Sequence, residues 1–143
     1  DKVIKAFEVV KSPVIVSDDS WSIKSLNGFP GPYMKSINEW FSPQDFLNLM
    51  KDKKDRSITY IQYLAYMDES VIKIFSNQMP GVVLEQPRGV NKNSPNMTVT
   101  VLDADKGRTV AEVFELGPKA IAERYNNTRD VWHEFAEWYS NNS

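Results

Sequence analysis

The sequence contains no cysteine, and this absence excludes several kinds of site at once. Without thiols there is no disulfide, no thiolate metal centre and no cysteine nucleophile. Histidine occurs once, at position 133, which argues against a histidine-rich metal site and against an ordinary Ser-His-Asp triad. A chain without cysteine fits a reducing compartment, and we expect a cytoplasmic protein.

Long apolar runs and an excess of positive charge are also missing. No stretch approaches the roughly 20 apolar residues that a transmembrane helix needs, and no signal peptide opens the chain. Lysine and arginine number 17 against 19 acidic residues, so the formal net charge is −2. Binders of duplex DNA or of anionic membranes normally carry a basic surface. We therefore expect neither a nucleic-acid polymer nor a membrane as a partner.

In other respects the amino-acid composition is that of an ordinary globular domain. Of the 143 residues, 41% are hydrophobic and 25% are charged, so the chain can bury a core of its own. The sequence shows no internal repeat and no second hydrophobic unit that would fold alone. We interpret residues 1–143 as a single domain.

The periodicity of the apolar residues predicts an alternation of helices and strands. Helical spacing occurs at residues 2–11, 33–41, 42–50, 117–125 and 130–139. Runs of β-branched and aromatic residues predict strands at residues 14–16, 21–26, 57–67, 71–75, 81–84, 97–102 and 109–114. This order indicates an α/β fold in which helices flank a sheet.

The strongest candidate for chemistry is the segment 16–20 (VSDDS). In an α/β sheet, ligands bind beyond the carboxyl ends of buried strands, where this segment is predicted to lie. Two adjacent carboxylates there are costly unless a cation or a proton compensates them. Such oxygen ligands suit Mg²⁺ that is also held by the phosphates of a substrate. The alternative is that Asp18 or Asp19 caps a turn.

Three other motifs are better explained by structure than by function. Residues 103–107 (DADKG) lack the further acidic positions of a calcium-binding loop and fit a hairpin turn. Residues 51–56 (KDKKDR) mix both signs of charge and fit a solvated connector. His133 lies within the final predicted helix, where we interpret it as a structural histidine.

The order of these pieces resembles that of the inosine triphosphate pyrophosphatase family. The resemblance rests mainly on the strand at residues 13–20 (PVIVSDDS) and on the turn at residues 26–33 (LNGFPGPY). The long strand with its return, the segments 87–89 (PRG) and 109–112 (TVAE), and the final helix follow in the family's order. The similarity spans essentially the whole chain and is strongest before residue 85.

The resemblance implies an elongated mixed β-sheet with flanking helices, usually in a homodimer, and a nucleotide bound in a cleft. The implied reaction is the Mg²⁺-dependent hydrolysis of non-canonical purine nucleoside triphosphates to monophosphate and pyrophosphate. The family's catalytic, metal-binding aspartate corresponds to Asp18, and its phosphate-binding lysine to Lys2. Its base-binding arginine corresponds to Arg129 or, one residue earlier in register, to Thr128. Asp19 replaces a family serine or threonine, and we expect it beside the metal with Asp18.

The sequence also departs from the family pattern. The family opens with a strand and a Thr/Ser-x-Asn-x-x-Lys phosphate loop, whereas this chain begins within the following helix. We therefore expect a truncated domain without the first strand, and an unpaired edge beside residues 14–16 or a partner that fills it. Residues 93–98 (NSPNMT) replace the base-pocket motif Phe-Gly-Trp-Asp, and residues 123–129 (ERYNNTR) replace the Ser-His-Arg motif. Three hypotheses remain: an active pyrophosphatase with an altered base pocket, a degenerate non-catalytic nucleotide binder, and an unrelated α/β protein.

Overall fold

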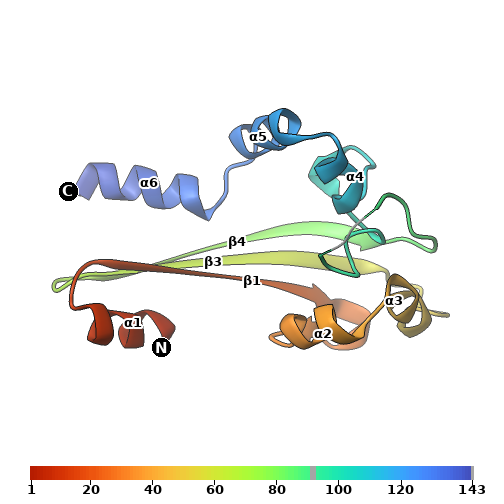
Figure 1. The fold of residues 1–143 in the computed structure, drawn as a ribbon, viewed down its shortest axis with the longest axis horizontal. Helices are drawn as coiled ribbons and strands as arrows, with labels where there is room; N and C mark the ends of the chain where they lie inside the picture. The colour runs from red at the N-terminus through yellow and green to blue at the C-terminus, as the bar shows by residue number, and fades with distance from the viewer. Residues whose placement is uncertain (91–92, 143) are drawn as a thin grey trace. The chain divides into compact units, whose positions relative to one another are not determined.

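The computed structural model describes residues 1–90 and 93–142, and these form six α-helices and five strands (Figure 1). The helices are α1 (Lys2–Val10), α2 (Met34–Trp40), α3 (Pro43–Leu49), α4 (Val110–Glu115), α5 (Pro118–Asn127) and α6 (Val131–Asn142). The strands are β1 (Val14–Ile23), β2 (Phe29–Gly31), β3 (Ser57–Met67), β4 (Ile72–Val83) and β5 (Thr100–Leu102). The predicted α/β class with flanking helices is confirmed.

The strands form one sheet in the order β2-β1-β3-β4-β5. β2 pairs antiparallel with β1 through residues 21–23, and β5 pairs antiparallel with β4 through residues 81–83. The turn between β1 and β2 contains Asn27 and Gly28 at positive φ, a conformation that these two residue types tolerate best. On the side of β2, residues 14–20 of β1 have no strand partner among the described residues. The unpaired edge predicted beside residues 14–16 is therefore present.

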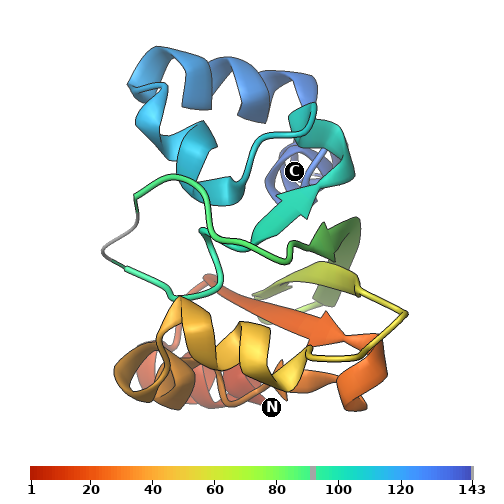
Figure 2. The same ribbon diagram turned by 90° about the vertical axis from the view of Figure 1, so that its right-hand side faces the viewer.

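The chain divides into two compact units. Unit 1 comprises residues 1–19, residues 61–77 and the segment from residue 128 onward, and unit 2 comprises residues 20–60 and 78–127. The long strands β1, β3 and β4 each contribute residues to both units. Within unit 2, α2 and α3 lie on one side of the sheet and α4 lies on the other, with α5 packed against α4 (Figure 2).

Unit 2 contains the larger core. Its buried hydrophobic residues are Trp21, Ile23, Ile37, Phe46, Met50, Ile58, Val83, Val99, Leu102 and Val110. Phe46, which is 1% exposed, belongs to this core, and a capping box between Ser42 and Asp45 fixes the start of α3 just before it. The ring of Phe46 contacts the ring of Phe41 edge to face, with 5.3 Å between the centroids. This aromatic contact joins α3 to the end of α2.

Unit 1 is closed by α6, which packs on β3 and β4 through aromatic rings. Its core joins Leu64, Phe75 and Val131, with Phe135 and Trp138 packed against them. Asp130, just before α6, accepts hydrogen bonds from the backbone N–H groups of residues 132 and 133 and lies 2.7 Å from Nδ1 of His133. His133 is thus part of the helix cap, in agreement with its structural interpretation.

Two pairs of predicted strands are in fact continuous. Residues 14–16 and 21–26 were expected as separate strands, but β1 runs without a break from Val14 to Ile23. Its polar residues stay exposed or half-buried, and alternation of side chains between the faces lets the backbone continue as strand. Likewise β4 joins the strands expected at residues 71–75 and 81–84. Pro80 precedes the first residue paired with β5, so its missing N–H removes no bond to that strand.

One prediction is wrong in type. Residues 109–114 were expected to form a strand, but residues 110–115 form the helix α4. The reason is a capping box: the hydroxyl of Thr109 accepts from the backbone N–H of Glu112, whose carboxylate accepts from the N–H of Thr109. The strand expected at residues 97–102 is also shorter than predicted, and only residues 100–102 belong to β5.

Candidate active site

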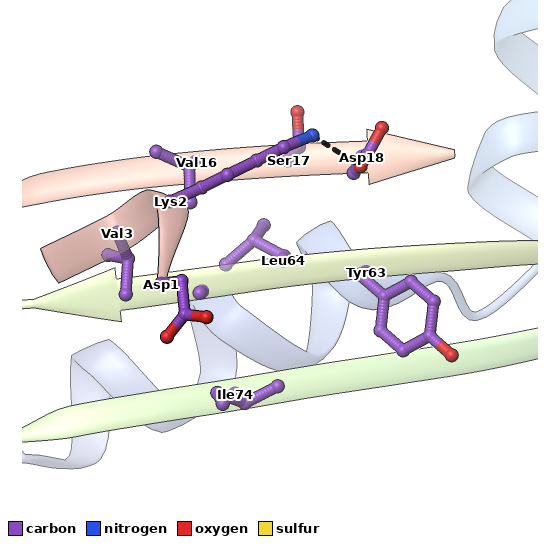
Figure 3. Close-up of a pocket in the computed structure, with 10 residues that line it drawn as sticks. Asp1, Lys2, Val3, Val16, Ser17, Asp18, Tyr63, Leu64 and Ile74 are labelled. Atoms are coloured by element: carbon purple, nitrogen blue, oxygen red, sulfur yellow. Dashed lines mark hydrogen bonds and ion pairs between the residues drawn. The ribbon is translucent and has the colours of Figure 1, made fainter. Parts of the chain in front are cut away.

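A cavity of about 300 Å³ in unit 1 contains Asp18, the residue on which the sequence interpretation depends. The cavity lies between the start of α1 and the neighbouring parts of β1, β3 and β4 (Figure 3). Its lining residues are Asp1, Lys2, Val3, Val16, Ser17, Asp18, Tyr63, Leu64, Ala65 and Ile74. All of them belong to unit 1. Asp18 lies within a strand and caps no turn, so the alternative role considered for it is not observed.

Lys2 and Asp18 form an ion pair in this cavity. Nζ of Lys2 donates to Oδ2 of Asp18 at 2.6 Å, and Figure 3 shows the lysine chain extended along β1 to reach it. The side chains remain open to solvent, with 73% of Lys2 and 59% of Asp18 exposed. An ion pair this exposed stabilises a fold little. Its two charges are therefore available to bind an anion and a cation instead of each other.

The floor of the cavity is apolar. Val3 and Leu64 are fully buried, and Tyr63 and Ile74 flank them from β3 and β4 (Figure 3). The arrangement is a polar rim over an apolar floor, which is common in ligand sites.

The structure does not place Asp19 in the cavity with Asp18. Successive residues of a strand project to opposite faces of the sheet, and Asp19 is absent from the cavity lining. The second carboxylate of the cavity belongs to Asp1 instead. Sequence reasoning missed Asp1, although its position directly before Lys2 at the start of a predicted helix was a usable signal.

Arg129 likewise does not line the cavity. Its guanidinium pairs with the carboxylate of Glu137, and hydrogen bonding to that carboxylate raises the pKa of Arg129 above its usual value. The backbone carbonyl of Arg129 accepts a hydrogen bond from Nδ2 of Asn77 at 3.1 Å. Both contacts lie within unit 1. The structure therefore unites Lys2 and Asp18 but not Arg129.

The oxygen donors of the cavity suit a magnesium ion shared with phosphate. No cluster of three or more histidine, aspartate or glutamate side chains able to hold a metal occurs within residues 1–90 and 93–142. Mg²⁺ commonly uses only one or two carboxylates and completes its shell with water and substrate phosphates. Asp18 supplies one accessible carboxylate of this kind.

In the part of the chain that is described, no helix has the length and apolar character to cross a membrane.

Comparisons of sequence identify several relatives. The "dITP/XTP pyrophosphatase" of Methanopyrus kandleri is 29% identical over 136 residues, which cover 94% of this chain and 69% of the relative. The "dITP/XTP pyrophosphatase" of Saccharolobus solfataricus is 29% identical over 133 residues, which cover 93% of this chain and 66% of the relative. The chain therefore spans about two-thirds of the length of these relatives.

Comparisons with solved structures and with a family model agree with the comparisons of sequence. The Ham1 protein of Staphylococcus aureus has a TM-score of 0.67 at 20% identity, covering 78% of this chain and 60% of that protein. The nucleoside-triphosphatase (dITP/XTP pyrophosphatase) of Mycobacterium abscessus has a TM-score of 0.69 at 17% identity, with coverages of 86% and 66%. These likenesses show a shared fold. The sequence pattern of the Ham1 family matches residues 1–132, and the chain belongs to the Ham1 family.

Proposed function

We propose that this chain is a nucleoside triphosphate pyrophosphohydrolase, which releases pyrophosphate and a nucleoside monophosphate from non-canonical purine nucleoside triphosphates. The observation that carries the proposal is the exposed Lys2–Asp18 pair on the rim of the 300 Å³ cavity. The relatives from Methanopyrus kandleri and Saccharolobus solfataricus are named dITP/XTP pyrophosphatase, which supports the choice of substrate. Residues 1–143 act in this proposal as a single pyrophosphatase-like domain.

The proposed mechanism begins with an exchange of partners. Lys2 leaves Asp18 and donates to a phosphate oxygen, which neutralises part of the substrate's charge. The carboxylate of Asp18 is then free to hold Mg²⁺ and to orient the attacking water. When bound, Mg²⁺ neutralises phosphate charge and makes a coordinated water more acidic. Phosphoryl transfer depends mainly on such positioning and charge compensation, and these two side chains supply both.

The charge of the cavity supports a requirement for a divalent cation in the proposed reaction. Two carboxylates, Asp1 and Asp18, line the cavity with the single lysine Lys2. A triphosphate would meet more negative than positive side chains there, and like charges at short range repel. A divalent cation held by the carboxylate of Asp18 would reverse this balance. We therefore expect nucleotide binding to be weak without Mg²⁺.

Asp19 and Arg129 have separate roles in the proposal, as a second metal ligand and as a contact to the base. Neither lines the cavity of Asp18, so each role needs its own test. We expect Asp19→Asn to raise the Mg²⁺ concentration needed for half-maximal activity, and Arg129→Ala to raise KM for the nucleotide without a matching loss of kcat. A variant with unchanged kinetics removes that residue from the proposed site.

We further propose that the protein works as a homodimer in the cytoplasm. The support is the edge of β1 at residues 14–20, where backbone N–H and C=O groups face no second strand among the described residues. Open strand edges pair readily with another chain. Analytical ultracentrifugation tests the assembly: a dimer that Val16→Pro dissociates supports edge pairing. A wild-type monomer at all concentrations refutes it.

A nucleotide panel tests the proposed reaction. The purified chain is incubated with Mg²⁺ and either dITP, XTP, ITP, ATP or GTP, and released pyrophosphate is measured. We expect turnover of the first three, loss of turnover when Mg²⁺ is chelated, and a strong reduction in Lys2→Met. No turnover of any nucleotide refutes the proposal, and thermal stabilisation by a nucleotide without product then identifies a non-catalytic binder.

A further inference from the structure

The cavity that contains Asp18 is charged at one end and apolar at the other. Figure 3 shows the Lys2–Asp18 ion pair beside β1, whereas Tyr63 and Ile74 lie across the cavity from it, on β3 and β4. The proposed roles of Lys2 and Asp18 are to bind phosphate and a cation, and neither role uses the apolar end. A ligand that fills the whole cavity therefore needs an apolar group next to its charged one.

Among the residues that line the cavity, Tyr63 is the aromatic one, and its side chain is unengaged. Among the described residues, no ring contacts the ring of Tyr63 and no group forms a hydrogen bond with its hydroxyl, and 46% of the residue is exposed. The other tyrosines of β3 are both engaged. The ring centroid of Tyr60 lies 4.6 Å from that of Trp21, and the hydroxyl of Tyr66 donates to Asp68 at 2.8 Å. Of these three tyrosines, Tyr63 is therefore the one whose ring is available to a bound molecule.

Ile74 adds a second exposed apolar side chain to the same end of the cavity. It lies on β4, the strand that neighbours β3, and 64% of it is exposed. Figure 3 shows the carboxylate of Asp1 on the side of Ile74 and away from the ring of Tyr63. A flat apolar group that covers Tyr63 and Ile74 removes their apolar surface from water, which is favourable.

The size of the cavity suits a ring system. A cavity of roughly 150 Å³ holds a benzene ring, and about 300 Å³ is present here. The space therefore admits a ring system larger than benzene beside the charged end. A nucleotide combines such a ring with phosphate groups. The face of every nucleobase can stack on an aromatic side chain, and this stacking contributes affinity whichever base is bound.

We infer that Tyr63 and Ile74 form a stacking platform for the base of a nucleotide whose phosphates bind at Lys2 and Asp18. The position of the phosphates rests on the proposed function, whereas the contact with the base rests on the exposed, unengaged ring of Tyr63 and on its neighbour Ile74. Because stacking uses the face of the base and not its hydrogen-bonding edge, the platform raises affinity without distinguishing one base from another.

Ligands that differ only in the base test this inference. Inosine monophosphate, adenosine monophosphate and ribose 5-phosphate are titrated separately, with Mg²⁺, into the ¹⁵N-labelled full chain, and amide chemical shifts report affinity and location. We expect both nucleotides to bind at least about tenfold more tightly than ribose 5-phosphate, which lacks the ring. Equal affinity of all three ligands, shifts confined to residues outside the cavity lining, or no binding of either nucleotide up to about 10 mM would each overturn the inference.

Variants at position 63 separate stacking from other contacts. Tyr63→Thr keeps a β-branched residue that suits a strand, and it should weaken both nucleotides by the same factor of about ten while ribose 5-phosphate binds as before. Tyr63→Phe keeps the ring and should bind all three ligands as the wild type does. Wild-type affinity in Tyr63→Thr, an equal loss in Tyr63→Phe, or an equal loss for ribose 5-phosphate overturns the stacking role.

Two isoleucines on β4 provide a matched control. Ile72 and Ile74 are two positions apart and both are exposed, but of the two only Ile74 lines the cavity. Ile74→Thr should weaken nucleotide binding about threefold, because less apolar surface is covered, and Ile72→Thr should leave it unchanged. Equal effects of these two variants contradict the placement of the base over Ile74.

The same titrations separate this inference from the proposed reaction. Monophosphates are the proposed products, so their binding is measured without turnover. A nucleotide advantage that Tyr63→Thr abolishes, in a chain that releases no pyrophosphate, refutes the reaction alone. Pyrophosphate release by a chain whose Tyr63→Thr variant binds nucleotides as the wild type does refutes the stacking platform alone.

Discussion

Replacement of Phe46 by alanine removes a buried ring from the unit 2 core, and the resulting loss of stability can be worked out from the structure. Phe46 is 1% exposed and packs against Phe41 and Phe29. Full burial of about 150–200 Å² at about 25 cal/mol per Å² gives about 4–5 kcal/mol, and phenylalanine-to-alanine changes in cores cost about 3–5 kcal/mol. Because a domain has only about 5–15 kcal/mol of stability, we expect Tm to fall by roughly 10–20 °C.

Urea denaturation measures this loss, and Trp40 provides the control. Trp40 lies one turn before α3, but 75% of its surface is exposed, so Trp40→Ala removes a larger side chain that buries little area. We expect Trp40→Ala to lower the free energy of unfolding by less than about 1 kcal/mol. A Phe46→Ala loss below about 2 kcal/mol, or equal losses in both variants, refutes the view that Phe46 anchors this core.

The remaining predictions concern a helix cap and an acidic turn. Thr109→Ala should lower stability by about 1 kcal/mol because it breaks the capping box with Glu112, and thermal melting checks this; a change within about 0.3 kcal/mol contradicts the cap assignment. Asp68 accepts hydrogen bonds from the backbone N–H of Ser70 and from the hydroxyl of Tyr66, and these bonds are the main causes that lower the pKa of its carboxyl to about 2. A depressed carboxyl pKa stabilises the fold above the unfolded value of about 4, and this stabilisation is lost as pH falls from about 4 to 2. Urea melts at pH 6 and pH 2.5 should therefore differ less in Asp68→Asn than in the wild type, and an equal difference contradicts the assignment.

Helices and strands whose sequence signals lie within a few residues of one another were predicted correctly. The β-branched and aromatic residues at positions 57–67 gave β3 its observed bounds, and Ser42-Pro43 marked the start of α3. The capping box of α4 was also readable, because Thr109 and Glu112 have the required spacing, but the β-branched residues favoured a strand. The prediction of a strand at residues 109–114 was therefore wrong because the β-branched residues were given more weight than the capping-box spacing.

Other features depend on contacts between distant parts of the chain. The continuity of β1 through its polar residues is set by neighbouring strands, which no local pattern records. The resemblance to the family predicted roles for Lys2 and Asp18, and the structure brings the two together across sixteen positions of sequence. The same reasoning placed Asp19 in the metal site with Asp18, and the structure shows only that Asp19 does not line the cavity that contains Asp18. The ion pair of Arg129 could not be predicted from sequence, because its partner Glu137 lies on the following helix, α6.

The most direct test of the account compares Asp18→Asn with Glu8→Gln in pyrophosphate release from dITP or XTP with saturating Mg²⁺. Both changes neutralise one exposed carboxylate of unit 1, but only Asp18 lines the cavity. We expect Asp18→Asn to lower kcat at least about 100-fold and Glu8→Gln to retain wild-type activity. Equal activity of the two variants, in a wild-type chain that turns over, would contradict the assignment of Asp18 as the catalytic residue.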